Sequence, residues 1–403
     1  MVVPEQETEA IEFILALGKA LHRYGTAANR LEEDIREVSR RLGLKVEVFT
    51  TPTTLIMSFG EPAELRTRME RVEAGELDLG KLGDIDDLVI QVARRELTPV
   101  EGMTRLQGII DAPSRYGYFV STLSHAVTAG SFTVFFGGSP ADVATSAMIG
   151  LLLGLLAQLM KRSFDQAHVF ELVGAAVAAF AAGVTSSLWS AVVPPLVTAA
   201  SLILLLPGMQ LTTAITELAT RNLIAGTARL MFAVIVLLQL VVGVFLGERL
   251  ANAVVDVHQA VPLPIAWWMP WAALVTASLG VTVLLRATPR AFGWILLASL
   301  VAYLGTRAGS EWLGKDMGVL IGAFALGVLG NLYSRWLQRP AQVVVVPAML
   351  LLVPGSLGFR AMSSLLGRQT LTGVETMFIM FVVAIAIVAG LLVANAVISP
   401  RRA

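Results

Sequence analysis

Ten long apolar runs fill the part of the chain that follows residue 115, and they constrain the fold more than any other feature. Roughly 20 mostly apolar residues are enough for a helix to cross the hydrocarbon core of a bilayer. A helix also satisfies its own backbone hydrogen bonds, which lipid cannot do for it. The sequence therefore predicts an α-helical polytopic membrane protein, with spans at 118–136, 141–160, 168–188, 192–216, 228–248, 264–285, 290–306, 317–334, 342–364 and 374–396.

Charged residues are concentrated before these runs. Residues 1–115 hold 36 of the 60 Lys, Arg, Asp and Glu residues, and the other 288 residues hold 24. Hydrophobic residues make up 55% of the whole chain, which is too many for an ordinary soluble protein. We therefore expect a small soluble domain over 1–115, followed by a membrane part.

The soluble part has the patterns of an α+β domain. Apolar residues three and four apart predict one amphipathic helix over 9–43. The stretches KVEVFTT, TLIMSF and LRTRMERV are typical of strands, and two helices follow, the second opened by a capping box at Thr98 and Glu101. No nucleophile and base are paired in this part, so we expect a regulatory or assembly role for it and no enzyme activity.

Basic residues in the loops predict the orientation. If residues 1–115 are inside, the inner loops carry ten Lys and Arg residues and the outer loops carry five. Because positive loops stay on the cytoplasmic side, both termini are expected there, in a cell inner or plasma membrane. The acidic N-terminus also lacks the pattern of a secretory signal.

Composition excludes several chemistries. The chain has no cysteine, so disulfides and thiolate metal sites are absent. No metal-ligand spacing or nucleotide-binding motif occurs, so neither a cofactor nor an ATP-driven pump is expected. The net charge is zero without a basic patch, and nucleic acid is not an expected partner.

The membrane part overlays itself when shifted by 147 residues, which moves Pro207 onto Pro354. The first five predicted spans then fall on the second five, giving units over 116–250 and 262–398. Since five is odd, the second unit enters the membrane from the opposite side, and a 5+5 inverted repeat results, as in many secondary transporters. The alternative is that any protein with ten spans overlays itself loosely.

Each unit contains a Pro-Gly pair inside its fourth span, in LLLPGMQL and in LLVPGSLGF. Proline removes a backbone donor and clashes with the preceding turn, so it breaks a helix. The half-helix that starts after the break points its positive N-terminal end at the cavity beside the break. This end favours a bound anion such as a carboxylate. We therefore predict a substrate site at the two breaks, and the alternative is a simple kink. Its members are Pro207, Gly208, Thr212, Thr213, Pro354, Gly355 and Ser356.

Other polar residues lie inside the predicted spans. Ser121, Ser124, His125 and Thr128 share one helix face, because they lie at i, i+3, i+4 and i+7. Hydroxyl residues also mediate helix packing, so either role is open for Ser121 and Thr128. His125 titrates near neutral pH and is a candidate proton carrier, although a structural hydrogen bond would also explain it. Glu171, about one turn inside the third span, and Glu217, after the first break, are the other candidates.

Several separated stretches resemble the threonine/serine exporter family. They are LALGKALHRYGTAANRLEEDIREVSRRLGLKVEVFTTPTTLIMSF, PGMQLTTAITELATRNLIAGTARL and LVPGSLGFRAMSSL. Gly25, Arg30 and Glu32 match the family pattern in the first stretch, and Pro207, Gly208, Glu217, Gly226 and Arg229 match it in the second. The resemblance implies a cytoplasmic N-terminal domain, ten spans and export of threonine and serine driven by the proton motive force. Some relatives are linked to dicarboxylates such as succinate.

These observations predict a secondary active exporter of small amino acids, threonine and serine first. The substrate carboxylate would meet the helix ends at Gly208 and Gly355. The rest of the amino acid would be hydrogen-bonded by the hydroxyls of Thr212, Thr213, Ser121 and Ser124. His125, Glu171 or Glu217 would carry the proton. Export of dicarboxylates, a passive metabolite channel and a membrane-anchored sensor are the alternatives. The lipid bilayer is an expected partner, and a homo-oligomer stays open.

Overall fold

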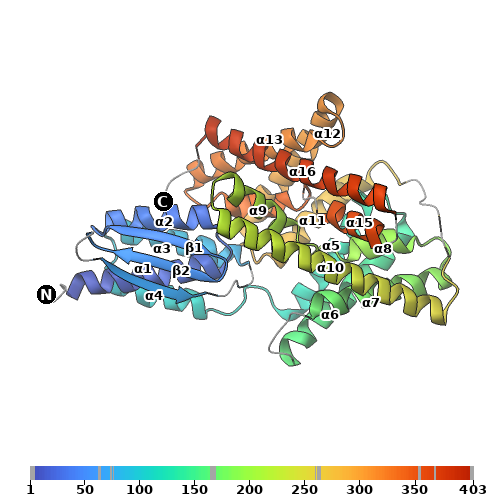
Figure 1. The fold of residues 1–403 in the computed structure, drawn as a ribbon, viewed down its shortest axis with the longest axis horizontal. Coiled ribbons are helices and arrows are strands. Elements are labelled where there is room, and N and C mark those ends of the chain that lie inside the picture. The colour runs from blue at the N-terminus through green and yellow to red at the C-terminus, as the bar shows by residue number, and fades with distance from the viewer. Residues whose placement is uncertain are drawn as a thin grey trace.

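The computed structural model describes residues 5–61, 65–72, 75, 77–163, 169–258, 260, 265–352, 355–366 and 369–399. The N-terminal part, residues 5–115, is a compact unit at one end of an elongated molecule, and helices make up the remainder (Figure 1). Its elements are α1 (Glu5–Arg23), α2 (Ala28–Arg41), β1 (Val46–Thr51), β2 (Thr54–Phe59), β3 (Arg66–Arg71), α3 (Leu79–Ala93) and α4 (Pro99–Asp111).

The helical remainder, residues 118–397, is called the membrane body below. Its helices are α5 (Tyr118–Phe135), α6 (Pro140–Ser163), α7 (Phe170–Leu188), α8 (Pro194–Ser201), α9 (Gly208–Ala219), α10 (Leu223–Val254), α11 (Met269–Leu284), α12 (Phe292–Leu313), α13 (Gly318–Leu337), α14 (Gln342–Met349), α15 (Gly355–Leu366) and α16 (Thr370–Val397). A short 3₁₀ helix at Pro289–Ala291 precedes α12.

All three predicted strands are confirmed. They form an antiparallel sheet in the order β1-β2-β3, and Thr51 pairs with Thr54 across a two-residue loop. Leu55 and Met57 of β2 are buried together with Phe13 and Leu17 of α1, so one face of the sheet packs on the helices. The capping box at the start of α4 is present in full: the Thr98 side chain accepts from the Glu101 N–H, and the Glu101 carboxylate accepts from the Thr98 N–H.

The single helix predicted over 9–43 is wrong, because the structure divides it into α1 and α2. Gly25 has φ +88°, a left-handed conformation that glycine adopts without strain. The N–H of Thr26 donates to the carbonyl of Leu21 at 3.1 Å, and the N–H of Gly25 donates to that of His22 at 3.1 Å. This pair of bonds ends α1. The chain then turns, and Ala28 becomes the first residue of α2.

Six helices among the described residues are long and apolar enough to cross a membrane, and α11 is a shorter apolar helix. This agrees with a polytopic membrane protein. Two of the expected spans continue well beyond their predicted ends: α10 runs to Val254, and α12 runs to Leu313. Arg249 and Arg307, two of the five basic residues counted in the outer loops, therefore lie within helices.

The two expected helix breaks are both present. The fourth apolar run consists of α8 and α9, and the ninth consists of α14 and α15. Helix contacts within the first five runs recur within the last five: α7 packs on α10 as α13 packs on α16, and α9 packs on α10 as α15 packs on α16. Between the two sets, α9 contacts α16, and α15 contacts α10.

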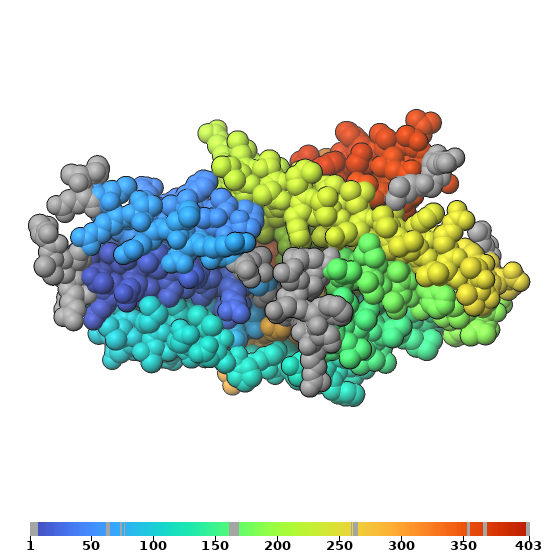
Figure 2. All heavy atoms as spheres, turned by 60° about the horizontal axis from the view of Figure 1, so that its bottom comes forward, coloured from blue at the N-terminus to red at the C-terminus, as the bar shows by residue number. Residues whose placement is uncertain are grey.

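The N-terminal part, blue in Figure 2, lies against the membrane body. Among the described residues, hydrogen bonds join the two at three places. At α9, the Ala28 N–H donates to the Glu217 carboxylate at 3.2 Å. At the segment after α11, the Leu79 N–H donates to Leu285 O at 3.0 Å, and the hydroxyl of Tyr116, just after the N-terminal part, donates to Ala287 O at 2.7 Å. Before α14, Arg339 donates to Asp87 at 3.4 Å.

Candidate functional site

The backbones of the two helix breaks touch each other. A Cβ atom added to Gly355 would lie 3.2 Å from Cα and 3.2 Å from N of Gly208, so any side chain there would press on the backbone of Gly208. Gly208 and Gly355 are the first residues of α9 and α15, and both are buried. Two segments 147 residues apart (355 − 208) thus bring their helix N-termini to one place inside the membrane body.

Most of the remaining residues predicted at the breaks lie near the starts of α9 and α15. The Thr212 hydroxyl is buried and donates to the Gly208 carbonyl at 3.1 Å, so it holds the first turn of α9. Thr213 and Ser356 are half-buried. Pro207 precedes α9 with φ −78° and ψ 39°, outside helical geometry. Pro354 lies outside the described residues.

The polar residues of α5 face two neighbouring helices. A Cβ atom added to Gly150 of α6 would lie 2.6 Å from the His125 carbonyl oxygen. A Cβ atom added to Gly154 would lie 3.2 Å from the His125 ring. Thr128 packs directly against Gly280 of α11. Its Oγ1 atom is buried and has no hydrogen-bond partner among the described residues. His125 Nδ1 lies 2.9 Å from the carbonyl of Ser121, and the Ser124 hydroxyl donates to Val120 O at 2.8 Å. Small residues therefore bring α5 close to both α6 and α11.

Glu171 lies nearer the helix end than we expected. Helix α7 begins at Phe170, so Glu171 is in its first turn and not one turn inside it. A carboxylate there is stabilised by the positive end of the helix. This position explains the residue without a proton-carrying role.

Glu217 lies at the centre of a buried polar network at the far end of α9. Its side chain is fully buried, and its two carboxylate oxygens accept from Arg229 Nε at 3.0 Å and Nη2 at 3.1 Å. Arg229 also donates to Gln210 Oε1 at 3.2 Å, and the N–H of Ala28 completes the set. Such a bidentate pair makes two charge-assisted hydrogen bonds in one fixed geometry.

The spacing from Gly226 to Arg229 also has a structural explanation. Helix α10 folds back on α9, and a Cβ at Gly226 would lie 2.9 Å from Ala214 O and 2.9 Å from Leu218 N. Glycine therefore permits the close approach, and Arg229 reaches Glu217 one turn later. Glu217 is nine residues after Gly208 (217 − 208), which places it about 13 Å along α9 from the break. The structure thus separates this carboxylate from the site predicted at the breaks.

Sequence reasoning missed Ala28 and Gln210 as members of this network. Ala28 gives no signal of its own, because it contributes only a backbone N–H from the start of α2. Gln210 follows the Pro-Gly pair by two residues, and this position was its only signal.

His22 of α1 lies beside this network. Its Nε2 is 3.0 Å from the carbonyl of Thr51, so Nε2–H donates, and Nδ1 is buried without a partner among the described residues. Burial lowers the pKa of His22 below its usual 6.5, and Arg229 lowers it further, while Thr51 and Glu217 act in the opposite direction.

We expect His22 to make the folded protein less stable in acid. The unfolded chain binds a proton as pH falls through about 6.5, whereas folded His22 does so only at lower pH, so stability is lost over that interval. Thermal unfolding at pH 7.5 and 5.5 measures the effect. His22→Gln, which keeps a donor for Thr51, should reduce the difference in midpoint between the two pH values. His258→Gln is the matched control, because His258 is exposed; an equal reduction by both variants would contradict the assignment.

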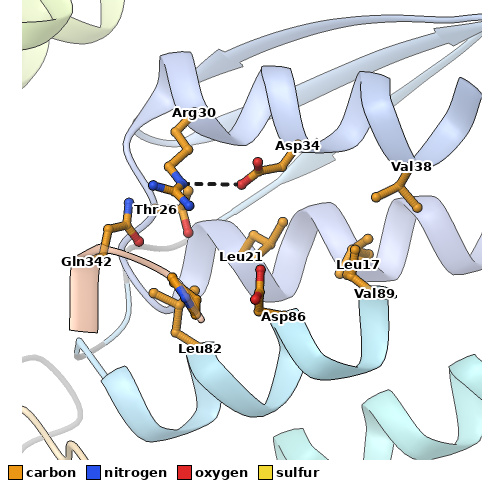
Figure 3. A pocket seen from close by; sticks show the side chains of 11 residues that line it. Leu17, Leu21, Thr26, Arg30, Asp34, Val38, Leu82, Asp86, Val89 and Gln342 are labelled. Carbon is orange, nitrogen blue, oxygen red and sulfur yellow. Dashed lines mark ion pairs between the residues drawn. The ribbon is translucent and has the colours of Figure 1, made fainter. Parts of the chain in front are cut away.

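A small cavity lies between the N-terminal part and the start of α14 (Figure 3). Arg30 and Asp34 of α2, Asp86 of α3 and Gln342 of α14 line it, and Arg30 pairs with Asp34 at 3.6 Å. Burial raises the pKa of Asp34, an effect that Arg30 partly offsets. Its volume of about 20 Å³ suits a water molecule and is too small for an amino acid.

Comparisons with known proteins agree with the membrane architecture. Two family models match, both described as threonine/serine exporter, one over residues 12–251 and the other over 271–397. Proteins named pheromone-regulated membrane protein 10 are similar: the chain is 28% identical to that of Zygosaccharomyces rouxii over 365 residues and 29% identical to that of Saccharomyces cerevisiae over 369. These matches cover 88% of this chain but 37% and 47% of the two yeast proteins, so the chain spans less than half of their length. No solved structure matches.

Proposed function

Because the chain belongs to the threonine/serine exporter family, we propose that it is a secondary active exporter of small amino acids, threonine and serine, driven by the proton gradient. The observation that carries this proposal is the meeting of Gly208 and Gly355, since two helix N-termini at one buried place form a binding site for a carboxylate. A protein that only anchored a soluble domain would not need two broken helices in contact.

The proposal includes ten membrane crossings. The crossings are the six long apolar helices, the single helices α5 and α11, and the two broken helices α8–α9 and α14–α15. Two sets of contacts support a 5+5 inverted repeat. The helix contacts within 116–250 recur within 262–398, and each set also contacts the other, since α9 contacts α16 and α15 contacts α10. In this arrangement the N-terminal domain over 1–115 is cytoplasmic, and so is the C-terminus.

The substrate carboxylate would be held at the N–H groups that open α9 and α15. Thr212, Thr213 and Ser356 lie within two turns of these helix starts, and Ser121 and Ser124 would contribute from α5, which contacts α8. Among the proposed proton carriers, His125 fits best, because Glu217 is held by Arg229 and Glu171 lies at a helix end.

The test is flux of labelled threonine in proteoliposomes with an imposed proton gradient. We expect accumulation that stops when the gradient is dissipated, with competition by excess serine. Accumulation blocked by succinate and not by serine would assign the chain to dicarboxylates instead. Equilibration without accumulation would indicate a passive channel and overturn the proposal of active transport.

A further inference from the structure

A second cavity, of about 500 Å³, lies in the membrane body beside α15. Its walls come from α8, α10, α15, α16 and the end of α5, and cavities of this size bind small molecules. Phe359 of α15 lines it only four residues after Gly355 (359 − 355), about 6 Å along the helix. The cavity is therefore next to one of the two breaks.

The position of the cavity along α10 places it away from the N-terminal part. Glu248 lines the cavity, and Arg229 belongs to the network that contacts Ala28. The two residues are 19 positions apart on one helix (248 − 229), which corresponds to about 28 Å. If residues 1–115 are cytoplasmic, the cavity lies at the outer side of the membrane.

The cavity carries one charge of each sign. Glu248 comes from α10 and Arg360 from α15, and no ion pair within 4.0 Å joins the two among the described residues. The Arg360 guanidinium lies over the ring of Phe136, 5.7 Å from its centroid, which fixes its position at the wall. Two opposite charges that line one space without meeting leave room for a ligand with both charges.

Hydroxyl groups complete the lining. Ser363 and Ser364 of α15 and Thr372 and Thr376 of α16 all lie at the cavity. Oγ of Ser363 is buried and has no hydrogen-bond partner in the described part of the chain. An unpaired buried hydroxyl costs free energy unless a bound molecule supplies the missing hydrogen bond.

We propose that this cavity binds a small zwitterionic α-amino acid. Arg360 pairs with the carboxylate, Glu248 pairs with the ammonium group, and Ser363 hydrogen-bonds a polar side chain or the carboxylate. The identity of the ligand rests on the proposed function, but its recognition rests on the residues of the cavity alone. Glu248 repels a second carboxylate, so the cavity selects an amino acid over a dicarboxylate.

Equilibrium binding of labelled threonine to the purified full chain in detergent tests this site without requiring transport. Loss of a charge-assisted hydrogen bond lowers affinity by about 10- to 100-fold. We therefore expect Glu248→Gln and Arg360→Gln each to weaken threonine binding at this cavity at least tenfold, and binding at the helix starts of α9 and α15 to remain. Arg360→Lys should recover part of the loss, and Glu248→Gln should improve competition by succinate relative to serine.

Two matched variants control for the charge change itself. Arg249→Gln neighbours Glu248 but contacts Phe245 instead of the cavity, and Glu375→Gln lies on α16 outside the lining. Both should bind threonine within twofold of the unmodified protein. Ser363→Ala removes only the hydroxyl oxygen, and a loss of affinity there would support the site even if a charge variant fails to fold.

Unchanged threonine binding in Glu248→Gln and Arg360→Gln would overturn the inference, whatever the flux of the unmodified protein. Another outcome is that the unmodified protein binds threonine, Glu248→Gln and Arg360→Gln lose affinity as expected, and no gradient-driven flux is seen. This outcome would retain the site and reject the exporter mechanism. The two proposals therefore fail in different experiments.

Discussion

Replacing Gly355 with leucine should abolish threonine flux in proteoliposomes, to below about one hundredth of the normal rate. The new Cβ would lie 3.2 Å from two backbone atoms of Gly208, and backbone cannot move aside as a flexible side chain does. The added leucine must therefore separate the helix starts of α9 and α15, and a misplacement of about 1 Å at a binding site is enough to cost about 100-fold in rate. Flux measured at equal protein per vesicle gives the comparison.

The control is the same substitution at a helical glycine with open surroundings. Gly293, in the first turn of α12, has no atom within 4 Å of its Cβ position, so Gly293→Leu should transport normally. Size-exclusion profiles of both variants check that each folds. Normal flux by a folded Gly355→Leu protein would show that the meeting of the breaks is not the substrate site.

Removing either partner of the Glu217–Arg229 pair should destabilise the protein by about 3 kcal/mol, because it leaves an uncompensated charge in a buried place. Glu217→Ala also removes the acceptor of the Ala28 N–H, so it should loosen the N-terminal part from α9. Thermal unfolding reports the stability. The rate of tryptic cleavage at the exposed Arg115, between α4 and α5, reports the loosening.

A double-mutant cycle separates this pair from general effects of mutation. Glu217→Leu combined with Arg229→Met should cost less than the sum of the single changes, since no unpaired charge remains. Lys19 and Glu70 form the matched surface pair, with side chains 47% and 36% exposed, and Lys19→Ala should cost less than about 1 kcal/mol. Additive effects at Glu217 and Arg229 would contradict the coupling.

The sequence predicted those features whose cause is local. Pro207-Gly208 and Pro354-Gly355 identified both breaks, because proline removes a hydrogen bond wherever it occurs in a helix. The stretch TLIMSF also predicted a strand from its own residues, and every second residue of β2 is buried in the structure. The error over 9–43 is also local: Leu21 and Ala28 keep helical spacing across Gly25, but the left-handed backbone of Gly25 is visible only in the structure.

The parts that could not be predicted depend on distant segments. The Glu217 carboxylate accepts a hydrogen bond from the N–H of Ala28, which is 189 residues away in the chain. The residues around either position give no indication of this contact. In the sequence, Glu248 looks like an ordinary charge near the end of a membrane helix, and only the structure shows that Arg360 and Thr372, from two other helices, line the same space. Helical periodicity identifies the face of one helix, but not the helices that complete a cavity.

The three attachments of the N-terminal part have a mechanical consequence. Glu217 belongs to the first set of five apolar runs, whereas Leu285, Ala287 and Arg339 lie in the second. In the proposed exporter, a unit that contacts both sets would resist rocking of one set against the other, so its contacts must deform or break when the sets move. Each transport cycle would then include a free-energy cost at these contacts.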